Sequence, residues 1–485
     1  MTRRGSPPVT IIGAGLVGSL LAALLAQRGF DVEVFERRPD PRERGFLGGR
    51  SINLALAERG LAALRTAGLA DAVLAQAVMM RGRMVHALDA STNLQRYGLD
   101  DSEVIHSVSR GGLNILLLDT AERAGAKLHF DAALADADFA AGSIRLADAA
   151  GTACEQQAGP LLGCDGAGSA LRAAMAREAD LGERIEPLGH GYKELEIPVL
   201  PSVAEGPGQQ PPSVAKSSVA GMTSSSPRPS APHFALEPHA LHIWPRGHYM
   251  CIALPNTEGN FTVTLFLPSA GSRPSFATLP DAAAARTFFE QQFADALALM
   301  PTFDGDWDAH PIGQLATLYL DRWHLDGRAV LLGDAAHAVV PFHGQGMNAG
   351  FEDAAELASL LAAQPGDPGA AFAEFETRRK PNADAIASMS LANYIEMRDG
   401  VADPHYLLKR ELVAALTERM PERFMSRYRM VSFTTLPYAT CVSRDRQQTA
   451  LMESILAGHD DLGSIDLDAA AAQARATLPL LPSGA

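Results

Sequence analysis

The first 36 residues alternate apolar runs and glycine turns in a pattern typical of a βαβ unit. A β-branched run predicts a strand over residues 9–12, a glycine turn follows over 13–18, and an apolar helix is expected over 19–28. A second strand is predicted over residues 32–35. Because a parallel strand pair needs a crossover connection, this spacing indicates two parallel strands joined by the helix.

The middle of the chain changes from helical to alternating patterns. Residues 53–78 are expected to be helical, and residues 106–124 to form a strand end that leads into a helix. Further on, short runs alternate apolar and polar positions, as antiparallel strands do when one face lies on a core. These runs predict a second, sheet-based domain inserted into the first, with strands at residues 192–197, 241–244, 249–254 and 261–267.

After residue 329 the pattern returns to the α/β type. We expect a strand over residues 329–332 and a helix over 351–363. The last hundred or so residues alternate helical stretches with polar turns, which favours a helical region at the end of the sequence.

One segment has no periodicity of either kind. Residues 201–232 contain 7 Pro, 8 Ser and 3 Gly, and such a composition buries too little apolar surface to offset its ordering entropy. We therefore predict a flexible surface loop there. The alternative is an ordered lid with a functional role.

Composition and charge narrow the class of protein. The 485 residues suffice for about three domains, and 47% hydrophobic with 20% charged residues is an ordinary globular balance. With 41 basic and 56 acidic residues the net charge is −15, so nucleic acid and anionic membrane surfaces are disfavoured as partners. The four cysteines lie far apart without a CxxC pair, which predicts neither a disulfide framework nor a local zinc site and favours a cytoplasmic location.

An uncharged stretch over residues 9–27 has the length of a signal peptide or a short membrane span. Gly13, Gly15 and Gly18 interrupt it at a defined spacing, and no A-x-A type cleavage site is present. We therefore divide the stretch into strand, turn and helix, and expect a soluble protein that does not enter a membrane.

The glycine turn carries the first chemical signal. Gly13-x-Gly15-x-x-Gly18 follows a strand and opens a helix, and Glu36 ends the next strand. The first glycine makes the turn, the second lets a pyrophosphate approach the backbone, the third lets helix pack on strand, and the acid accepts from a ribose hydroxyl. A bound ADP-containing cofactor is predicted, with a merely tight glycine turn as the alternative. Glu36 favours FAD or NAD over NADP, although Arg37 and Arg38 leave some ambiguity.

A second signal, some three hundred residues later, favours FAD. Leu331-Leu332-Gly333-Asp334-Ala335-Ala336-His337 is followed by Pro341-Phe342-His343-Gly344-Gln345-Gly346-Met347-Asn348 at the start of a helix. An NAD domain is usually complete within its local βα units, whereas the extended FAD molecule needs residues from remote segments.

Three groups of residues, which follow one another along the chain as in that family, resemble the class A FAD-dependent aromatic hydroxylases. They are the glycine turn, the pair of segments at 331–348, and Gly163-Cys164-Asp165-Gly166 with Ser169 and Arg172 and the earlier Arg110 and Leu113. Asp165-Gly166 alone could equally be a hairpin turn.

Further strings are similar to the kynurenine 3-monooxygenase family within that class. They lie at residues 49–56, 80–84, 192–195, 241–245 and 393–397, and the resemblance runs from about residue 9 to 478. The loop at 201–232 is longer than the family needs. The carboxyl-terminal membrane anchor of eukaryotic members has no counterpart, which predicts a soluble, bacterial-type enzyme.

The resemblance implies an α/β fold: a Rossmann-like FAD-binding domain with an inserted antiparallel-sheet substrate domain and a C-terminal helical region. The expected divisions are 1–75, 106–189 and 306–380 for the FAD-binding domain, 76–105 and 190–305 for the substrate domain, and 381–485 for the helical region.

The resemblance also implies the residues of the site. For the substrate L-kynurenine, the carboxylate is expected at Arg83, Tyr97, Asn393 and Tyr428, and the remaining contacts at Phe266, Phe342, His343, Ile252, Leu254, Glu396 and Met397. For FAD, the expected residues are Gly13, Gly15, Val17, Gly18, Glu36, Arg37, Arg38, Ala55, Arg110, Leu134, Asp165, Asp334, Gly346, Met347 and Asn348. His337 and His343 lack carboxylate partners at metal spacing, so no metal site is expected.

The chemistry implied by the resemblance is an aromatic hydroxylation. NADPH reduces FAD, O₂ adds to the reduced ring at C4a, and the hydroperoxide delivers oxygen to the carbon ortho to the substrate's amino group. An aniline is already electron-rich, so no catalytic side chain is assigned. Two alternatives stay open: a class A hydroxylase of another aromatic acid, and a non-catalytic flavin-fold binding protein of the GDP-dissociation-inhibitor type.

Overall fold

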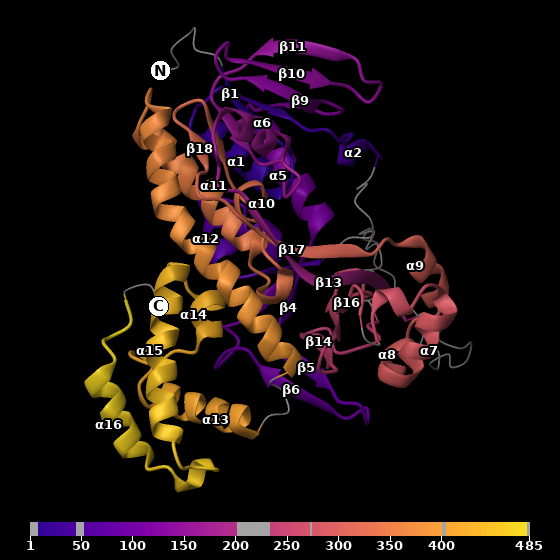
Figure 1. Ribbon diagram of the computed structural model, residues 1–485, viewed down its shortest axis with the longest axis vertical. Helices are drawn as coiled ribbons and strands as arrows, with labels where there is room; N and C mark the ends of the chain where they lie inside the picture. The colour runs from indigo at the N-terminus through magenta and orange to yellow at the C-terminus, as the bar shows by residue number, and fades with distance from the viewer. Residues whose placement is uncertain (1–7, 45–52, 201–232, 272–273, 400–403, 483–485) are drawn as a thin grey trace, which may run out of the picture.

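The computed structural model describes residues 8–44, 53–200, 233–271, 274–399 and 404–482. Figure 1 shows a central sheet with its helices in the upper part of the molecule, a second sheet with helices to one side, and the last helices below. The loop predicted at 201–232, and residues 49–52 of the segment 49–56, lie outside the described residues.

The first sheet has six strands and contains the predicted βαβ unit. All neighbouring strands are parallel except β18 and β19, and helix α1 (Leu16–Gln27) connects β1 with β2. The order is β18 (His324–Leu325), β19 (Ala329–Leu331), β12 (Leu161–Gly163), β1 (Val9–Ile12), β2 (Val32–Phe35) and β8 (Lys127–His129).

Helix α1 explains the uncharged stretch near the start of the sequence. It packs against α5 (Arg110–Arg123) and α11 (Gly346–Ala363), and Leu20 and Leu24 are fully buried. A helix that is apolar on all sides belongs in a protein core, and its 12 residues span only about 18 Å. Within the described residues, no helix is long and apolar enough to cross a membrane.

Two predicted helices begin earlier than their patterns indicated. Helix α1 begins at Leu16 instead of 19, and α11 begins at Gly346 instead of 351. The apolar pattern hides these first turns because glycines occupy them, whereas the backbone is already helical there.

The prediction of a continuous helical segment at 53–78 is wrong. The chain forms β3 (Asn53–Leu56), α3 (Glu58–Thr66), α4 (Ala70–Leu74) and β4 (Ala77–Met80). Both strands pair antiparallel with β7 (Ile105–Ser109). Runs of four residues are too short to reveal a period, and a partner remote in sequence decides their conformation.

The second sheet has seven strands and includes the four predicted ones. The order is β17 (Gly313–Tyr319), β13 (Arg184–Ile197), β16 (Phe261–Pro268), β15 (Met250–Pro255), β14 (Ala240–Pro245), β5 (Gly82–His86) and β6 (Thr92–Arg96). Its pairs are antiparallel with one correction, because β14 and β5 run parallel. The edge strand β17 follows the helices of this domain, so it connects the two sheets in sequence.

The pleat of this sheet separates a core face from an open face. Leu195, Val263 and Leu265 face one side, where they pack with Phe289 and Trp307. Their neighbours along the strands, which include Glu194, Thr264 and Phe266, point to the other side. The core-side helices are α7 (Ala282–Gln292), α8 (Ala294–Leu297) and α9 (Phe303–Ala309).

The expected helical region at the end of the sequence is confirmed. It comprises the second half of α12 (Pro368–Asp399), α13 (Pro404–Arg419), α14 (Arg427–Phe433), α15 (Tyr438–Leu456) and α16 (Leu467–Thr477). In Figure 1 the single long helix α12 runs from the upper sheet domain down to these helices. The exact domain divisions stay a prediction.

A further small sheet, besides the one formed by β3, β7 and β4, and several short elements were not predicted. The sheet is formed by β9 (Ala133–Asp138), β10 (Ser143–Ala147) and β11 (Ala153–Gln157). The short elements are α2 (Pro41–Arg44), α6 (Ala170–Glu178), α10 (Asp334–His337), and the 3₁₀ turns Phe276–Thr278, Pro341–His343 and Leu462–Ser464.

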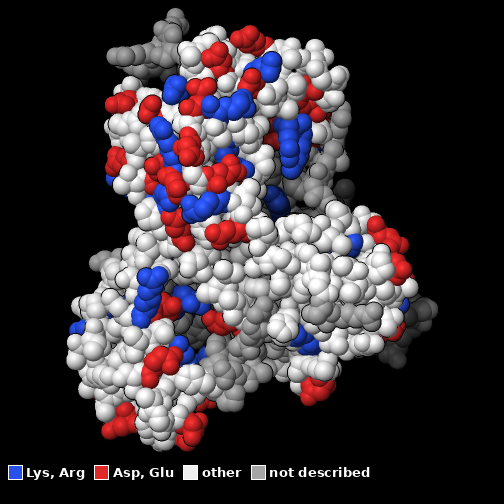
Figure 2. Space-filling view, viewed as in Figure 1, with Lys and Arg blue, Asp and Glu red and all other residues white. Residues whose placement is uncertain are grey.

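On the face shown in Figure 2, acidic and basic side chains gather on the upper sheet domain and are interspersed there. The part that holds α7 to α9 shows few charges on that face. Because basic side chains alternate with acidic ones, they do not form a continuous basic surface on the face shown.

Candidate active site

The residues expected at the cofactor lie where parallel strands end. Gly13 follows β1, Glu36 follows β2, Asp165 follows β12 and Asp334 follows β19. Ligands of doubly wound sheets bind at the carboxyl ends of the strands, so these four positions surround one site.

The three glycines of the turn have different structural reasons. Gly13 has a φ of 99°, and a Cβ there would lie 2.6 Å from the Cys164 carbonyl oxygen. At Gly18 a Cβ would lie 2.0 Å from the Gly13 oxygen, so close packing of helix on turn excludes a side chain. Gly15 differs, because a Cβ there would meet no atom within 4 Å and the residue faces a cavity. Its missing side chain therefore fits a ligand at the helix N-terminus rather than a packing need.

Glu36 is oriented by the backbone of the turn. Its Oε2 accepts from the Ala14 amide at 2.8 Å and its Oε1 from the Arg38 amide at 3.0 Å. A carboxylate has about four acceptor positions, so each oxygen retains one for a further donor. This arrangement fits a ligand with hydroxyl groups, as a ribose has.

Asp165 is already engaged by its own chain. Its carboxylate accepts from the Ala170 amide at 2.7 Å, the Leu171 amide at 3.2 Å and the Ser169 hydroxyl at 2.5 Å, and thereby caps helix α6. It also lines the cavity. Its first role is to fix the turn after β12, and we expect its contact with a cofactor to come beside that role.

A single cavity of about 720 Å³ connects these strand ends with the open face of the seven-stranded sheet. Most residues expected at the site line it, and it extends from Gly15 and Glu36 at one end to Arg83 and Tyr428 at the other. The expected residues on its wall are Arg83, Tyr97, Tyr428, Phe266, Phe342, His343, Ile252, Leu254, Met397, Gly13, Gly15, Val17, Glu36, Arg37, Arg38, Ala55, Arg110, Leu134, Asp165, Asp334, Gly346 and Met347.

Four expected residues do not line this cavity, and two of them hold its wall from behind. Asn348 is fully buried; its Nδ2 donates to the Ala55 and Gly344 oxygens at 2.9 and 2.8 Å, and its Oδ1 accepts from the Ala57 amide. Asn393 donates to the Phe342 oxygen at 2.7 Å. The remaining two are Gly18, inside α1, and Glu396, which accepts from Arg427 at 2.7 Å.

A cation and two phenol rings form the far end of the cavity. The Arg83 guanidinium lies 5.6 Å from the Tyr97 ring centre and 5.0 Å from that of Tyr428, and the two rings stack at 5.0 Å. Among the described residues no carboxylate forms an ion pair with Arg83, and the side chains in contact with the buried Tyr97 hydroxyl are Arg83 and Tyr428, which both carry donors. This end of the cavity therefore has donors in excess, which fits an anionic group.

The charge of Arg83 persists despite burial. Burial alone would lower the pKa of its guanidinium, but Tyr97, Tyr428 and Glu396 raise it above its usual value. Burial raises the pKa of both the Tyr97 and the Tyr428 hydroxyl, so both phenols keep their protons at neutral pH. Arg83 and the two hydroxyls can thus all donate to one acceptor.

His343 is a neutral residue of this wall. It stacks on Tyr428 at 5.6 Å between ring centres, and neither of its ring nitrogens has a partner among the described residues. Burial, with help from the positive charges of Arg427, Arg83 and Arg59, lowers the pKa of His343 to about 3. At neutral pH the imidazole is therefore uncharged and a very weak base.

This pKa predicts an acid-sensitive step in stability. Unfolded His343 takes up a proton below about pH 6.5, whereas the folded protein resists protonation until about pH 3, so stability rises with pH in this window and falls on acidification. At pH 5 the loss relative to pH 7 is expected to reach about 2 kcal/mol from this residue alone. Urea unfolding of parent and His343→Gln proteins at pH 7 and pH 5 measures it; an equal acid loss in both would contradict the assignment.

Several polar residues of the cavity wall were missed by the sequence analysis. Tyr192 and Glu194 on β13, Thr262 and Thr264 on β16, and Gln314 on β17 all face the cavity. Burial raises the pKa of Glu194, against the opposing effects of His310 and Arg110. The alternation along residues 192–197 was the available signal, because it separates this face from the core face.

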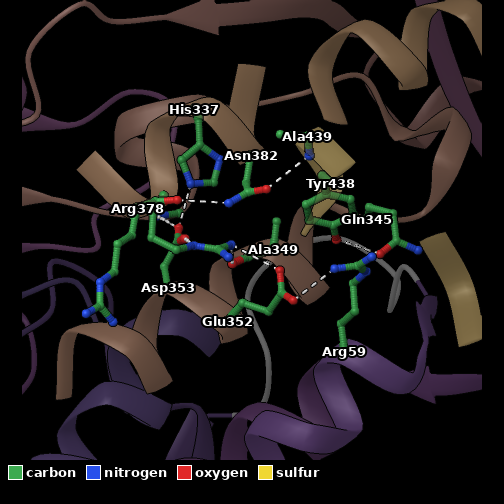
Figure 3. A network of polar contacts seen from close by, with 12 residues as sticks. Arg59, His337, Gln345, Ala349, Glu352, Asp353, Arg378, Asn382, Tyr438 and Ala439 are labelled. Carbon is green, nitrogen blue, oxygen red and sulfur yellow. Dashed lines mark hydrogen bonds and ion pairs between the residues drawn. The ribbon is translucent and has the colours of Figure 1, made fainter. Parts of the chain in front are cut away.

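A buried network joins the cofactor-side strand ends to the last helices (Figure 3). The buried Asp353 carboxylate accepts from the Gly333 amide at 3.0 Å, from His337 at 2.5 Å and from Arg379 at 2.6 Å. Burial alone would raise the pKa of the Asp353 carboxyl, but His337 and Arg379 hold it below its usual value. His337 is thus engaged by a carboxylate, and no three His, Cys, Asp or Glu side chains group as metal ligands in the described part of the chain.

The same network continues through Glu352 to the last helices. Glu352 accepts from Arg379 and from Arg59, each at 3.1 Å. The Arg59 guanidinium lies 3.9 Å from the Tyr438 ring centre, and the Tyr438 hydroxyl donates to Gln345 at 2.8 Å. The loop at 341–346, which lines the cavity, is therefore fixed by helices from three regions of the sequence.

Comparisons with known proteins agree with this geometry. Residues 6–193 and 286–390 match the FAD binding domain family. The chain is 52% identical to a kynurenine 3-monooxygenase of Stenotrophomonas maltophilia over 482 residues, which covers 99% of both chains. It is 53% identical to one of Xanthomonas axonopodis pv. citri over 471 residues, 97% of both chains.

Solved structures share the fold at lower identity. A tetrameric 2-methyl-3-hydroxypyridine-5-carboxylic acid oxygenase has a TM-score of 0.60 at 20% identity, with 83% of this chain and 96% of that chain covered. PqsL of P. aeruginosa, solved in complex with 2-aminobenzoylacetate, has a TM-score of 0.60 at 21% identity, with 81% and 97% covered.

Proposed function

Because the chain belongs to the kynurenine 3-monooxygenase family, we propose that it hydroxylates L-kynurenine to 3-hydroxykynurenine with FAD as cofactor, NADPH as reductant and O₂ as oxidant. The observation that carries the proposal is the single cavity that extends from the glycine turn to Arg83. A hydroxylation needs its cofactor and its substrate beside each other, and this continuous cavity provides room for both.

The residues on the strand-end side of the cavity fit FAD. Gly15 leaves room for a pyrophosphate at the N-terminus of α1, where the helix dipole favours negative charge. Glu36 accepts from ribose hydroxyls through its free acceptor positions, and the N-terminus of α11 favours negative charge on a flavin ring. Bound FAD would accept electrons from NADPH and activate O₂, chemistry that protein side chains lack.

The far end of the cavity fits the amino-acid part of kynurenine. Arg83 binds the carboxylate, and the hydroxyls of Tyr97 and Tyr428 donate further hydrogen bonds to it. Asn393, expected at the substrate, also holds Phe342 in place, and Glu396 also holds Arg427. The aromatic ring lies against apolar side chains from the sheet and from the loop at 341–346, namely Ile252, Leu254, Phe266, Phe342 and Met397.

No side chain is required as a strong base. The aromatic amino group of kynurenine already directs electrons to the ortho carbon. His343, with a pKa of about 3, stacks on Tyr428 and takes no proton at neutral pH. The chain's own contribution is to bind, orient and exclude water from the apolar part of the cavity.

We also propose a cytoplasmic location. The support is the cysteine pattern, with Cys164, Cys251 and Cys441 buried and unpaired, as a reducing compartment allows.

NADPH oxidation with and without L-kynurenine, followed by identification of the product, tests the proposal. We expect yellow protein, faster oxidation with kynurenine, and 3-hydroxykynurenine as the product. Acceleration by another aromatic acid and not by kynurenine would contradict the substrate. A colourless protein that binds no flavin would instead point to a non-catalytic binding protein.

Deleting residues 203–229 is expected to leave fold and turnover largely intact. The Leu200 amide donates to the His233 oxygen at 3.1 Å, so the two flanks already meet, and the deletion leaves five residues to join them. Loop length adds little to the free energy of closure. Thermal unfolding and kynurenine turnover measure the effect; loss of most activity in a stable deletion variant would show a working lid.

A further inference from the structure

The short helix α14 carries Tyr428 between two charged residues that reach different parts of the molecule. Arg427 donates to Glu396 on α12 at 2.7 Å and to Asp445 on α15 at 3.2 Å. Arg429 donates in the other direction, to Glu103 in the connection between β6 and β7. Tyr428 lies between them and faces the cavity.

The contact between Arg429 and Glu103 is a bidentate, mostly buried ion pair. The Arg429 Nε lies 3.1 Å from Oε1 and 2.9 Å from Oε2 of Glu103, and its Nη2 also donates to Oε1. The two side chains are only 10% and 18% exposed. A charge-assisted, forked contact of this kind fixes geometry more strictly than a surface pair does.

Glu103 also fixes the loop that follows Tyr97. Its Oε2 accepts from the Leu99 amide at 2.9 Å. Its own Cβ lies where Gly98 has no side chain, since a Cβ on Gly98 would approach it to 2.1 Å. One carboxylate therefore holds the segment next to Tyr97 and the residue next to Tyr428.

We propose that Glu103 and Arg429 are positioning residues for the substrate carboxylate: their ion pair sets Tyr428 against Tyr97, so that both hydroxyls and Arg83 point to one place. This inference rests on the proposed function. Neither residue lines the cavity, so they act through the two tyrosines, whose rings stack at 5.0 Å beside Arg83.

The pair is expected to affect substrate affinity far more than turnover. The misplacement of a binding group by about 1 Å can cost about 100-fold in rate at limiting substrate. Glu103→Gln removes the charge and keeps the size of the side chain, so we expect KM for kynurenine to rise about 10- to 100-fold. We expect kcat to change less than about 3-fold, because the apolar wall and the cofactor residues are untouched.

Asp101→Asn is the matched control. Asp101 lies in the same loop and pairs with Arg81 and Arg96, but its side chain is 53% exposed. Exposed ion pairs contribute little, so KM is expected to stay within about 2-fold of the parent. Equal effects in Asp101→Asn and Glu103→Gln would attribute the change to the loop as a whole and would overturn the proposal.

A double-mutant cycle separates a shared role from two independent ones. If Glu103 and Arg429 act as one unit, Glu103→Gln with Arg429→Gln is expected to raise KM no further than the worse single variant. If the fold increases in KM of the two single variants multiply in the double variant, the two residues act independently and the proposed unit is contradicted. Arg429→Lys keeps the charge and loses the bidentate contact, and it is the second variant should Arg429→Gln fail to fold. We expect its KM to lie between those of the parent and Glu103→Gln.

A crystal structure of Glu103→Gln keeps this inference separate from the proposed function. We expect the Tyr97 and Tyr428 rings to move apart from their 5.0 Å stacking, whatever the substrate is. Unchanged rings or a normal KM would overturn the positioning role. A parent protein that does not respond to kynurenine would refute the proposed function, and the ring geometry would still decide the role of the pair.

Discussion

Replacing Gly15 with aspartate is expected to give a folded, colourless protein. The residue has an ordinary φ of −69°, it is the N-cap of α1, and a Cβ there meets no protein atom within 4 Å. Aspartate is a favourable N-cap, so the free energy of unfolding is expected to stay equal or rise by a few tenths of a kcal/mol. The same carboxylate would lie against the cofactor pyrophosphate, where like charges repel. Absorbance of the purified protein near 450 nm measures the bound flavin.

Gly15→Asn separates charge from size in this test. Asparagine has nearly the volume of aspartate and caps helices equally well. We expect it to retain more flavin than aspartate does, because only the aspartate adds a negative charge. Stoichiometric flavin in a folded Gly15→Asp protein would refute the placement of FAD at this turn.

Replacing Arg83 with methionine is expected to weaken kynurenine binding by about 2 to 5 kcal/mol. The substrate carboxylate would then enter a buried site with no cation, because no other Lys or Arg side chain among the described residues lines that end of the cavity. The flavin content is expected to stay unchanged, since the strand ends proposed to hold FAD lie at the other end of the cavity from Arg83. Kynurenine should then no longer accelerate NADPH oxidation at concentrations that saturate the parent enzyme.

Arg81→Met is the matched control for this change. Arg81 lies just before β5, two residues from Arg83, and makes an ion pair with the exposed Asp101. The loss of such a pair is expected to leave kynurenine binding within about 2-fold of the parent. Normal kynurenine affinity in a yellow, folded Arg83→Met protein would refute the carboxylate role and reopen the choice of substrate.

The cofactor side of the cavity was predictable because its signals are local. The glycine turn, Glu36 and Asp334 each follow a buried strand, and parallel strands bring their carboxyl ends to one edge. The orientation of the Asn348 side chain could not be predicted from local signals. The role of Asn348 at the cofactor stays a prediction, and its side-chain amide contacts Ala55, Ala57 and Gly344. Which way a buried amide points depends on partners almost 300 residues away.

The residues proposed for the substrate could be brought together from the sequence only through the family resemblance. Arg83 lies near the start of β5, Tyr97 directly follows β6, and Tyr428 lies on the short helix α14. Nothing in these segments indicates that the three side chains meet. Glu194 and Thr264 were missed for a related reason. Their alternation predicted a strand correctly, but it did not reveal that the polar face of this sheet lines a cavity instead of facing bulk water.

The pleat of the seven-stranded sheet places neighbouring residues of one strand under different constraints on substitution. Leu195, Val263 and Leu265 face the hydrophobic core, where a change of even one methylene is costly. Glu194 and Thr264, each one residue away, face the cavity instead. A substitution at such a cavity-facing position alters the shape and polarity of the cavity with little effect on the free energy of unfolding. The preference for one aromatic acid over another can therefore drift along alternate positions of β13 and β16 while the scaffold stays the same.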